Sequence, residues 1–85
     1  MNVAYLCLGG NIGNRKLILA QAMLKINESV GSIITTSAIY ETEAWGVTNQ
    51  QPYLNCCIEV HTPLKCEELM KTLLEIEFDL GRKRN

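Results

Sequence analysis

Three segments of the chain carry the apolar and polar patterns of β-strands. Residues 3–8 are an unbroken apolar run that two glycines end. Such a run is typical of a strand with little water on either face, so we expect it in the centre of a sheet. Residues 33–40 are rich in β-branched side chains, which favour extended backbone. Strict alternation from residue 54 to residue 61 predicts a strand with one face in the core. That core face consists of Leu54, Cys56, Ile58 and Val60.

Two further segments have the spacing of amphipathic helices. The first can be capped by Asn11 or Asn14 and ends at Gly31. Its apolar residues recur at intervals of three and four, so they share one side of the helix: Leu19, Met23, Ile26 and Val30. The second helix opens at residues 62–63 and ends at Gly81. Its inward stripe consists of Cys66, Leu69, Met70, Leu73, Ile76 and Leu80.

The predicted order of elements is β-α-β-β-α, which indicates the α+β class. It supplies five of the six elements of a ferredoxin-like βαββαβ unit, whose last strand normally lies against the first. Without that strand, residues 3–8 have an open edge that favours pairing with another chain. We therefore expect residues 1–85 to be a single truncated domain, with a homodimer or strand exchange through the first strand.

Composition places the chain among ordinary globular proteins. Apolar residues make up 47% of the 85 residues and charged residues 20%, with a formal net charge of −1. No apolar run approaches the roughly 18 residues that span a bilayer, and the N-terminus lacks the charged region of a signal peptide. We expect a cytoplasmic protein that binds neither membrane nor nucleic acid, because a chain without excess positive charge is a poor partner for phosphate backbones.

The four cysteines sit within the apolar patterns. We expect Cys7, Cys56, Cys57 and Cys66 to be reduced thiols in the core, where free cysteine usually lies. A structural zinc site takes ligand pairs separated by two to four residues. The close pair in this chain is adjacent and there is one histidine, so we predict no metal centre built from these residues.

Residues 41–52 have no regular period, which predicts a long loop of the kind that often carries function. Trp45 lies in this loop and Tyr53 where it rejoins the sheet, and core periodicity explains neither ring. Flat rings at a loop edge can clamp a planar heterocycle. Asn55 lies on the same strand face as Tyr53 and offers both a donor and an acceptor. An exposed tyrosine and asparagine at a strand start would give the same pattern.

The end of the chain is locally basic, since residues 82–84 hold three of its eight cations. Arginine forks suit phosphate, although a solvated tail has the same sequence. Glu77 lies close to the apolar stripe of its helix, either paired with Arg82 or Arg84 or bonded to a ligand. The glycine-rich residues 9–14 lack the spacing of a phosphate-binding loop, so a structural turn is favoured there.

Taken together, residues 5–13, 40–42, 53–55 and 76–84 resemble the 6-hydroxymethyl-7,8-dihydropterin pyrophosphokinase family of folate biosynthesis. The resemblance covers the chain as the N-terminal part of a longer protein. It implies a ferredoxin-like fold that transfers pyrophosphate from MgATP to the pterin hydroxymethyl oxygen and releases AMP. It also implies ATP as co-substrate and two Mg²⁺ ions as cofactors.

The resemblance implies roles for single residues on the pterin side of the site. Tyr53 would stack on the pterin and Asn55 would hydrogen-bond its edge. Thr42, Glu43 and Trp45 would line the pterin through the long loop.

On the other side, the resemblance implies that Glu77, Arg82 and Arg84 belong to the ATP site, with the two arginines as catalytic residues. The aspartates that hold magnesium in the family are expected beyond Asn85. We therefore expect the 85-residue chain to be inactive alone.

Two departures from the usual family pattern concern loop conformation. Gly10 stands where the family commonly has serine, and residues 43–44 where it commonly has two prolines. The alternative is a non-catalytic ferredoxin-like module that binds a ligand or dimerises. An RNA-binding sheet is a third possibility, against which Glu59 and the acidic balance count.

Overall fold

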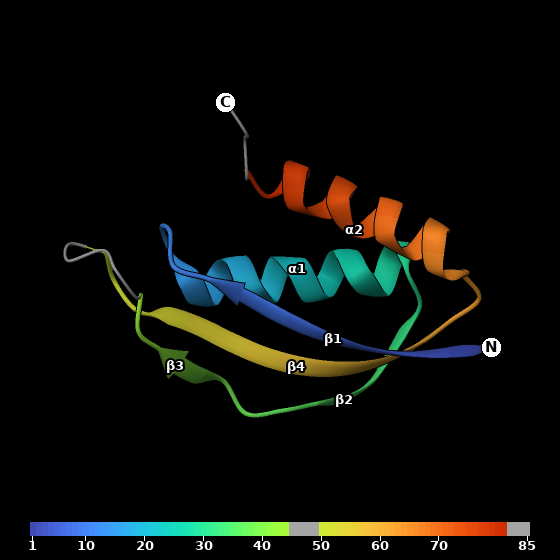
Figure 1. The fold of residues 1–85 in the computed structure, drawn as a ribbon, viewed down its shortest axis with the longest axis horizontal. Helices are drawn as coiled ribbons and strands as arrows, with labels where there is room; N and C mark the ends of the chain where they lie inside the picture. The colour runs from blue at the N-terminus through green and yellow to red at the C-terminus, as the bar shows by residue number, and fades with distance from the viewer. Residues whose placement is uncertain (45–49, 82–85) are drawn as a thin grey trace.

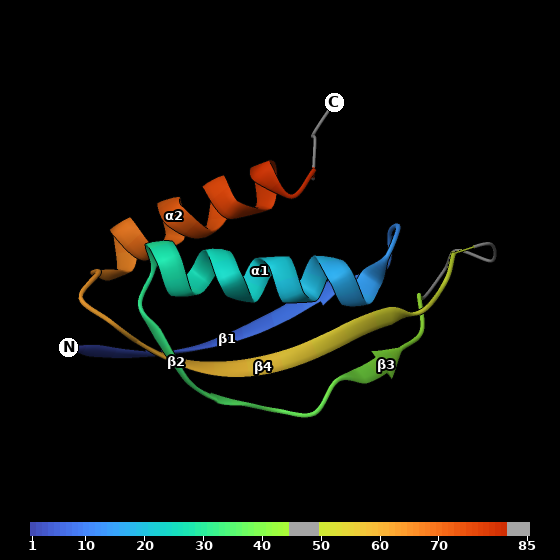
Figure 2. The same ribbon diagram turned by 180° about the vertical axis from the view of Figure 1, so that it is seen from behind.

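A computed structural model describes residues 1–44 and 50–81 of the chain. The elements in order are β1 (Asn2–Gly10), α1 (Arg15–Ser29), β2 (Ser32–Thr36), β3 (Tyr40–Thr42), β4 (Tyr53–Thr62) and α2 (Cys66–Asp79). Both helices lie on one side of the sheet, and no described helix covers its other side (Figures 1 and 2). This is the predicted α+β class, consistent with a partial ferredoxin-like fold. The strand predicted over residues 33–40 is divided into β2 and β3, and β3 extends into the predicted loop.

The strand β4 is the centre of the described sheet. The strand β1 pairs with it along its whole length, from Asn2 opposite Thr62 to Gly10 opposite Leu54. The strands β2 and β3 also pair with β4, and all three pairings are antiparallel. The register of β2 shifts within residues 33–35, which marks a bulge.

The prediction that residues 3–8 form a central strand is wrong for the described sheet. The strand β1 lies at its edge, where exposed and half-buried residues alternate, and the Tyr5 side chain is 77% exposed. An apolar run indicates that both faces of a strand are covered by other parts of the protein. It does not specify where the strand lies in the order of the sheet.

The core lies between β4 and the helices. The inward face predicted for β4 is confirmed, because Leu54, Cys56, Ile58 and Val60 are all buried. The stripe predicted for α1 also holds, with Met23 half-buried and the others buried. The buried core cluster consists of Ile26, Val30, Cys56, Ile58, Val60 and Ile76.

The stripe predicted for α2 is too wide. Ile76 is buried and Leu69, Leu73 and Leu80 pack against the core, but Cys66 and Met70 are exposed. The helix packs mainly against α1 and does not lie flat on the sheet, so a narrower strip of its surface is covered.

Local hydrogen bonds set the helix ends. The side chain of Asn14 caps α1, where its Oδ1 accepts a hydrogen bond of 3.2 Å from the backbone N–H of Leu17. Gly81, with φ of 92°, follows the end of α2 as predicted.

The start predicted for α2 at residues 62–63 is wrong. Thr62 is the last residue of β4, and its hydroxyl donates to the carbonyl oxygen of Val30 and accepts from the N–H of Leu64. The helix begins at Cys66, where the Glu68 carboxylate accepts from the N–H of Lys65 at 3.2 Å. A buried threonine with both bonds satisfied thus ends the strand before the helix can begin.

The expectation that the four cysteines are reduced thiols in the core is confirmed only in part. All four thiols are free, but Cys56 alone is buried, Cys57 is half-buried, and Cys7 and Cys66 are exposed. The placement of the other three in the core is therefore wrong, because Cys7 and Cys57 lie on the helix-free face of the sheet. Within residues 1–44 and 50–81, no helix is long and apolar enough to cross a membrane.

Candidate functional site

One end of the helix-free face gathers three of the predicted site residues. Tyr53 and Asn55 project from β4 on the face opposite buried Leu54, because side chains alternate along a strand. Thr42 on β3 lies directly opposite Tyr53 in the register. The Nδ2 atom of Asn55 donates a hydrogen bond of 2.8 Å to the Oγ1 atom of Thr42. Two strands thus fix an amide beside an aromatic ring.

The Asn55 amide also depends on Gly9. These residues are opposite each other in the pairing of β1 with β4. A Cβ atom added at Gly9 would lie 2.7 Å from the Oδ1 atom of Asn55, so a side chain there would displace the amide. The Asn55 amide offers an acceptor oxygen and two donor hydrogens. One of these hydrogens is donated to the Thr42 hydroxyl.

The turn after β1 is tied to the end of the long loop. The Nε2 atom of Gln51 donates to the carbonyl oxygens of Asn11 at 2.9 Å and Gly13 at 3.2 Å. The Nη1 atom of Arg15 donates to the carbonyl oxygen of Pro52 at 2.8 Å. These bonds favour the structural turn over an anion cradle, since they hold the turn against the segment that leads into Tyr53.

The sequence alone does not reveal this connection. Asn11, Arg15 and Gln51 are polar residues of two segments about forty positions apart, with nothing in their spacing to link them. The register between β1 and β4 brings the segments together, and that register is a property of the folded sheet.

Thiols continue the same face beyond Asn55. The Sγ atom of Cys57 lies 3.4 Å from the Sγ atom of Cys7 and 3.7 Å from the hydroxyl oxygen of Tyr40. The hydrogen bond with Cys57 and then the neighbouring Cys57 charge raise the pKa of Cys7 and the pKa of Tyr40. Both groups are therefore protonated near neutral pH, and this part of the face gains no negative charge from them.

The other predicted site residues are spread more widely. Glu43 follows β3 and is exposed, while Glu77 is half-buried on α2, on the helix side of the sheet. The C-terminal end of α2 is at the same end of the molecule as β3 and the turn after β1 (Figure 1). Trp45, Arg82 and Arg84 lie outside the described residues.

No metal centre is formed by the part of the chain that the structure describes. Three or more histidine, cysteine, aspartate or glutamate side chains do not come together anywhere in residues 1–44 and 50–81.

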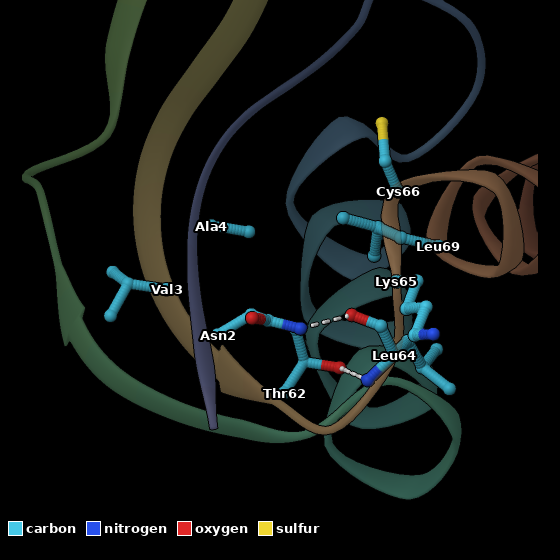
Figure 3. Close-up of a pocket in the computed structure, with 8 residues that line it drawn as sticks. All are labelled: Asn2, Val3, Ala4, Thr62, Leu64, Lys65, Cys66 and Leu69. Carbon is cyan, nitrogen blue, oxygen red and sulfur yellow. Dashed lines mark hydrogen bonds between the residues drawn. The ribbon is translucent and has the colours of Figure 1, made fainter.

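A hollow of about 430 Å³ lies at the opposite end of β1 and β4. Figure 3 shows it beside Leu64, whose backbone bonds the side chains of Asn2 and Thr62. The rest of its lining comes from Val3, Ala4, Lys65, Cys66 and Leu69. None of the predicted site residues lines this hollow. The cluster around Asn55 brings three of them together, and we take it as the candidate site.

Comparison with known proteins agrees with the resemblance seen in the sequence. Residues 5–85 match the family described as 7,8-dihydro-6-hydroxymethylpterin-pyrophosphokinase. A 2-amino-4-hydroxy-6-hydroxymethyldihydropteridine pyrophosphokinase of Porphyromonas gingivalis is 37% identical over 82 residues, which cover 96% of this chain and 56% of the relative. The protein of that name in Bacillus subtilis is 39% identical over 84 residues, 98% of this chain and 50% of the relative.

A longer relative is the folate synthesis bifunctional protein of Arabidopsis thaliana, 38% identical over 80 residues that cover 94% of this chain and 16% of that protein. The chain spans about half the length of the two bacterial relatives. Because the family match begins in β1 and runs to Asn85, the chain belongs to the 7,8-dihydro-6-hydroxymethylpterin-pyrophosphokinase family.

Proposed function

We propose that the protein containing this chain transfers pyrophosphate from ATP to the hydroxymethyl group of 6-hydroxymethyl-7,8-dihydropterin, in folate synthesis in the cytoplasm. Residues 1–85 are then the N-terminal part of its single domain. Family membership and the names of the relatives support the reaction. The observation that carries the assignment of the pterin site is the Asn55 amide, which is bonded to Thr42 beside Tyr53.

A pterin matches this cluster in shape and in hydrogen bonding. Its flat ring system stacks on the Tyr53 ring, and its edge of donors and acceptors meets the Asn55 amide. Thr42 holds the amide before the ligand arrives, so little rotational freedom is lost on binding. Glu43 and Trp45 line the pterin from the loop between β3 and β4.

In the proposed reaction, the hydroxymethyl oxygen attacks the β-phosphorus of ATP in line. The new O–P bond forms as the bond from the β-phosphorus to the oxygen shared with the α-phosphate breaks, and AMP leaves. The proton of the hydroxyl passes to water. Arg82 and Arg84 neutralise the phosphate charge that builds up, and Glu77 belongs to the nucleotide side.

ATP enters as its magnesium complex, with two ions expected. The described residues do not gather a ligand set for them, so we assign no metal ligand within residues 1–44 and 50–81. We expect the isolated 85-residue chain to form no AMP at rates comparable to those of the full-length gene product.

Steady-state assay of the full-length gene product tests this function. We expect AMP to form from ATP only when 6-hydroxymethyl-7,8-dihydropterin is present. Tyr53→Ala removes the stacking ring and should raise the KM for the pterin about tenfold, which corresponds to about 1.4 kcal/mol. The control Thr35→Ala alters an exposed residue of β2 away from the cluster. AMP formation that needs no pterin, or equal KM values in the two variants, would refute the assignment.

A further inference from the structure

An exposed thiol and a half-buried thiol face each other on the helix-free side of the sheet. Cys7 on β1 and Cys57 on β4 are directly opposite in the antiparallel register. Their Sγ atoms lie 3.4 Å apart, so the sulfurs are already in contact. Free cysteine is usually buried, but Cys7 is exposed and Cys57 is half-buried. Reagents in solution therefore reach this pair.

The Cys57 backbone is bonded on both sides within the described sheet. The backbone of Cys57 is fixed by Ser37, whose N–H donates to its carbonyl oxygen at 2.8 Å and whose Oγ accepts from its N–H at 2.8 Å. By contrast, β1 is an edge strand of the described sheet. The sulfurs are 3.4 Å apart, so a small shift of β1 relative to β4 is enough to bring Cys7 to Cys57.

We propose that Cys7 and Cys57 form a reversible disulfide by exchange with a low-molecular-weight disulfide such as oxidised glutathione. Directly opposed strand residues have the Cα separations that a disulfide requires, and the sulfurs must approach from 3.4 Å to the roughly 2.05 Å of an S–S bond. The other described cysteines do not offer this arrangement, since Cys56 points into the core and Cys66 opens α2.

The exchange takes place in two balanced steps. The minor fraction of Cys7 that has lost its proton to water attacks one sulfur of oxidised glutathione, and the S–S bond of glutathione breaks to release one glutathione thiolate, which takes up a proton. Cys57 then loses its proton to water, its thiolate attacks the Cys7 sulfur of the mixed disulfide, and the second glutathione leaves as a thiolate that takes up a proton. Two protein thiols are oxidised and one glutathione disulfide is reduced. In a reducing compartment the bond is transient, as expected of a redox-responsive site.

This site is separate from the pterin cluster, although the two share a face of the sheet. Cys57 is two residues beyond Asn55 on β4, and the proposed oxidation requires neither pterin nor ATP. The experiment below therefore stands whether or not the proposed transferase activity is correct.

Peptide mapping of the full-length protein after equilibration with excess oxidised glutathione tests the proposal. Remaining thiols are blocked by alkylation, and the digest is analysed without reduction. We expect a linked peptide pair containing Cys7 and Cys57, with the mass of two hydrogens lost, and a glutathione adduct on Cys66. The linkage should disappear when reduced glutathione is added in excess.

The variant Cys7→Ala is the matched control, because it alters an exposed side chain and leaves Cys57 in place. In that variant we expect Cys57 to carry glutathione or an alkyl group and to form no internal disulfide. The proposal is overturned if wild-type Cys7 and Cys57 remain alkylated, or both carry glutathione, while Cys66 is modified. The proposal is also overturned if the main disulfide joins Cys7 or Cys57 to Cys56 or Cys66.

Discussion

At the scale of single residues, the proposed pterin site depends on how the Asn55 amide is held. Thr42 binds one of its hydrogens, and Gly9 leaves the space that its oxygen occupies. The sequence was sufficient to place Tyr53 and Asn55 on one face, because strand periodicity fixes which side chains share a face. It could not reveal the part of Gly9, because the close approach arises from the register between two strands far apart in the chain.

We predict that Gly9→Ala weakens pterin binding. The added methyl group would lie 2.7 Å from the Asn55 oxygen and displace the amide from the position in which Thr42 holds it. Loss of about one well-placed hydrogen bond should raise the Kd about tenfold, as measured by titration calorimetry. Gly10→Ala is the control, since a Cβ atom there meets nothing within 4 Å. Equal affinities of the two variants would show that the amide position does not govern binding.

At the scale of elements, the strongest predictions came from segments with regular burial. The alternating pattern of β4 and the stripe of α1 appear as predicted, because each of these elements packs one face on the core. The prediction for β1 was wrong because composition reports burial and gives no strand order. The start of α2 was missed because a hydrogen-bonded corner at Thr62 overrides the helix signal of the following proline.

We predict that Gly31→Ala destabilises the fold. Gly31 lies between α1 and β2, where a Cβ atom would clash with the backbone carbonyl oxygen of His61. The backbone of β4 cannot yield as a flexible side chain would, so we expect a loss of about 2–3 kcal/mol in the free energy of unfolding. Urea denaturation measures this loss. The control Gly10→Ala should change the free energy of unfolding by no more than about 0.5 kcal/mol. An equally small change for Gly31→Ala would contradict the close approach of Gly31 to the His61 backbone.

At the scale of the whole molecule, the described chain has two surfaces with separate consequences. The helix-free face carries the Asn55 cluster, where we propose that the pterin binds, at one end and the thiol pair beside it. The outer edge of β1 has no strand partner among the described residues. The proposed role of the helix-free face rests on the family match, and the open edge of β1 follows from the predicted order of elements.

We predict that the isolated 85-residue chain associates through the edge of β1. Unpaired backbone N–H and C=O groups on an exposed strand favour pairing with a second copy. Sedimentation velocity over a range of concentrations should show a dimer that dissociates on dilution. A folded monomer at all concentrations would contradict this prediction.

The central claim is that the Asn55 amide recognises the pterin edge. The most direct test is the Kd of 6-hydroxymethyl-7,8-dihydropterin for the full-length gene product, measured by calorimetry on the wild type, Asn55→Ala and Thr35→Ala. Asn55→Ala should weaken binding about tenfold or more, because its loss leaves donors and acceptors of the bound pterin unpaired. Thr35→Ala should bind as the wild type does. Unchanged affinity of Asn55→Ala would contradict the account.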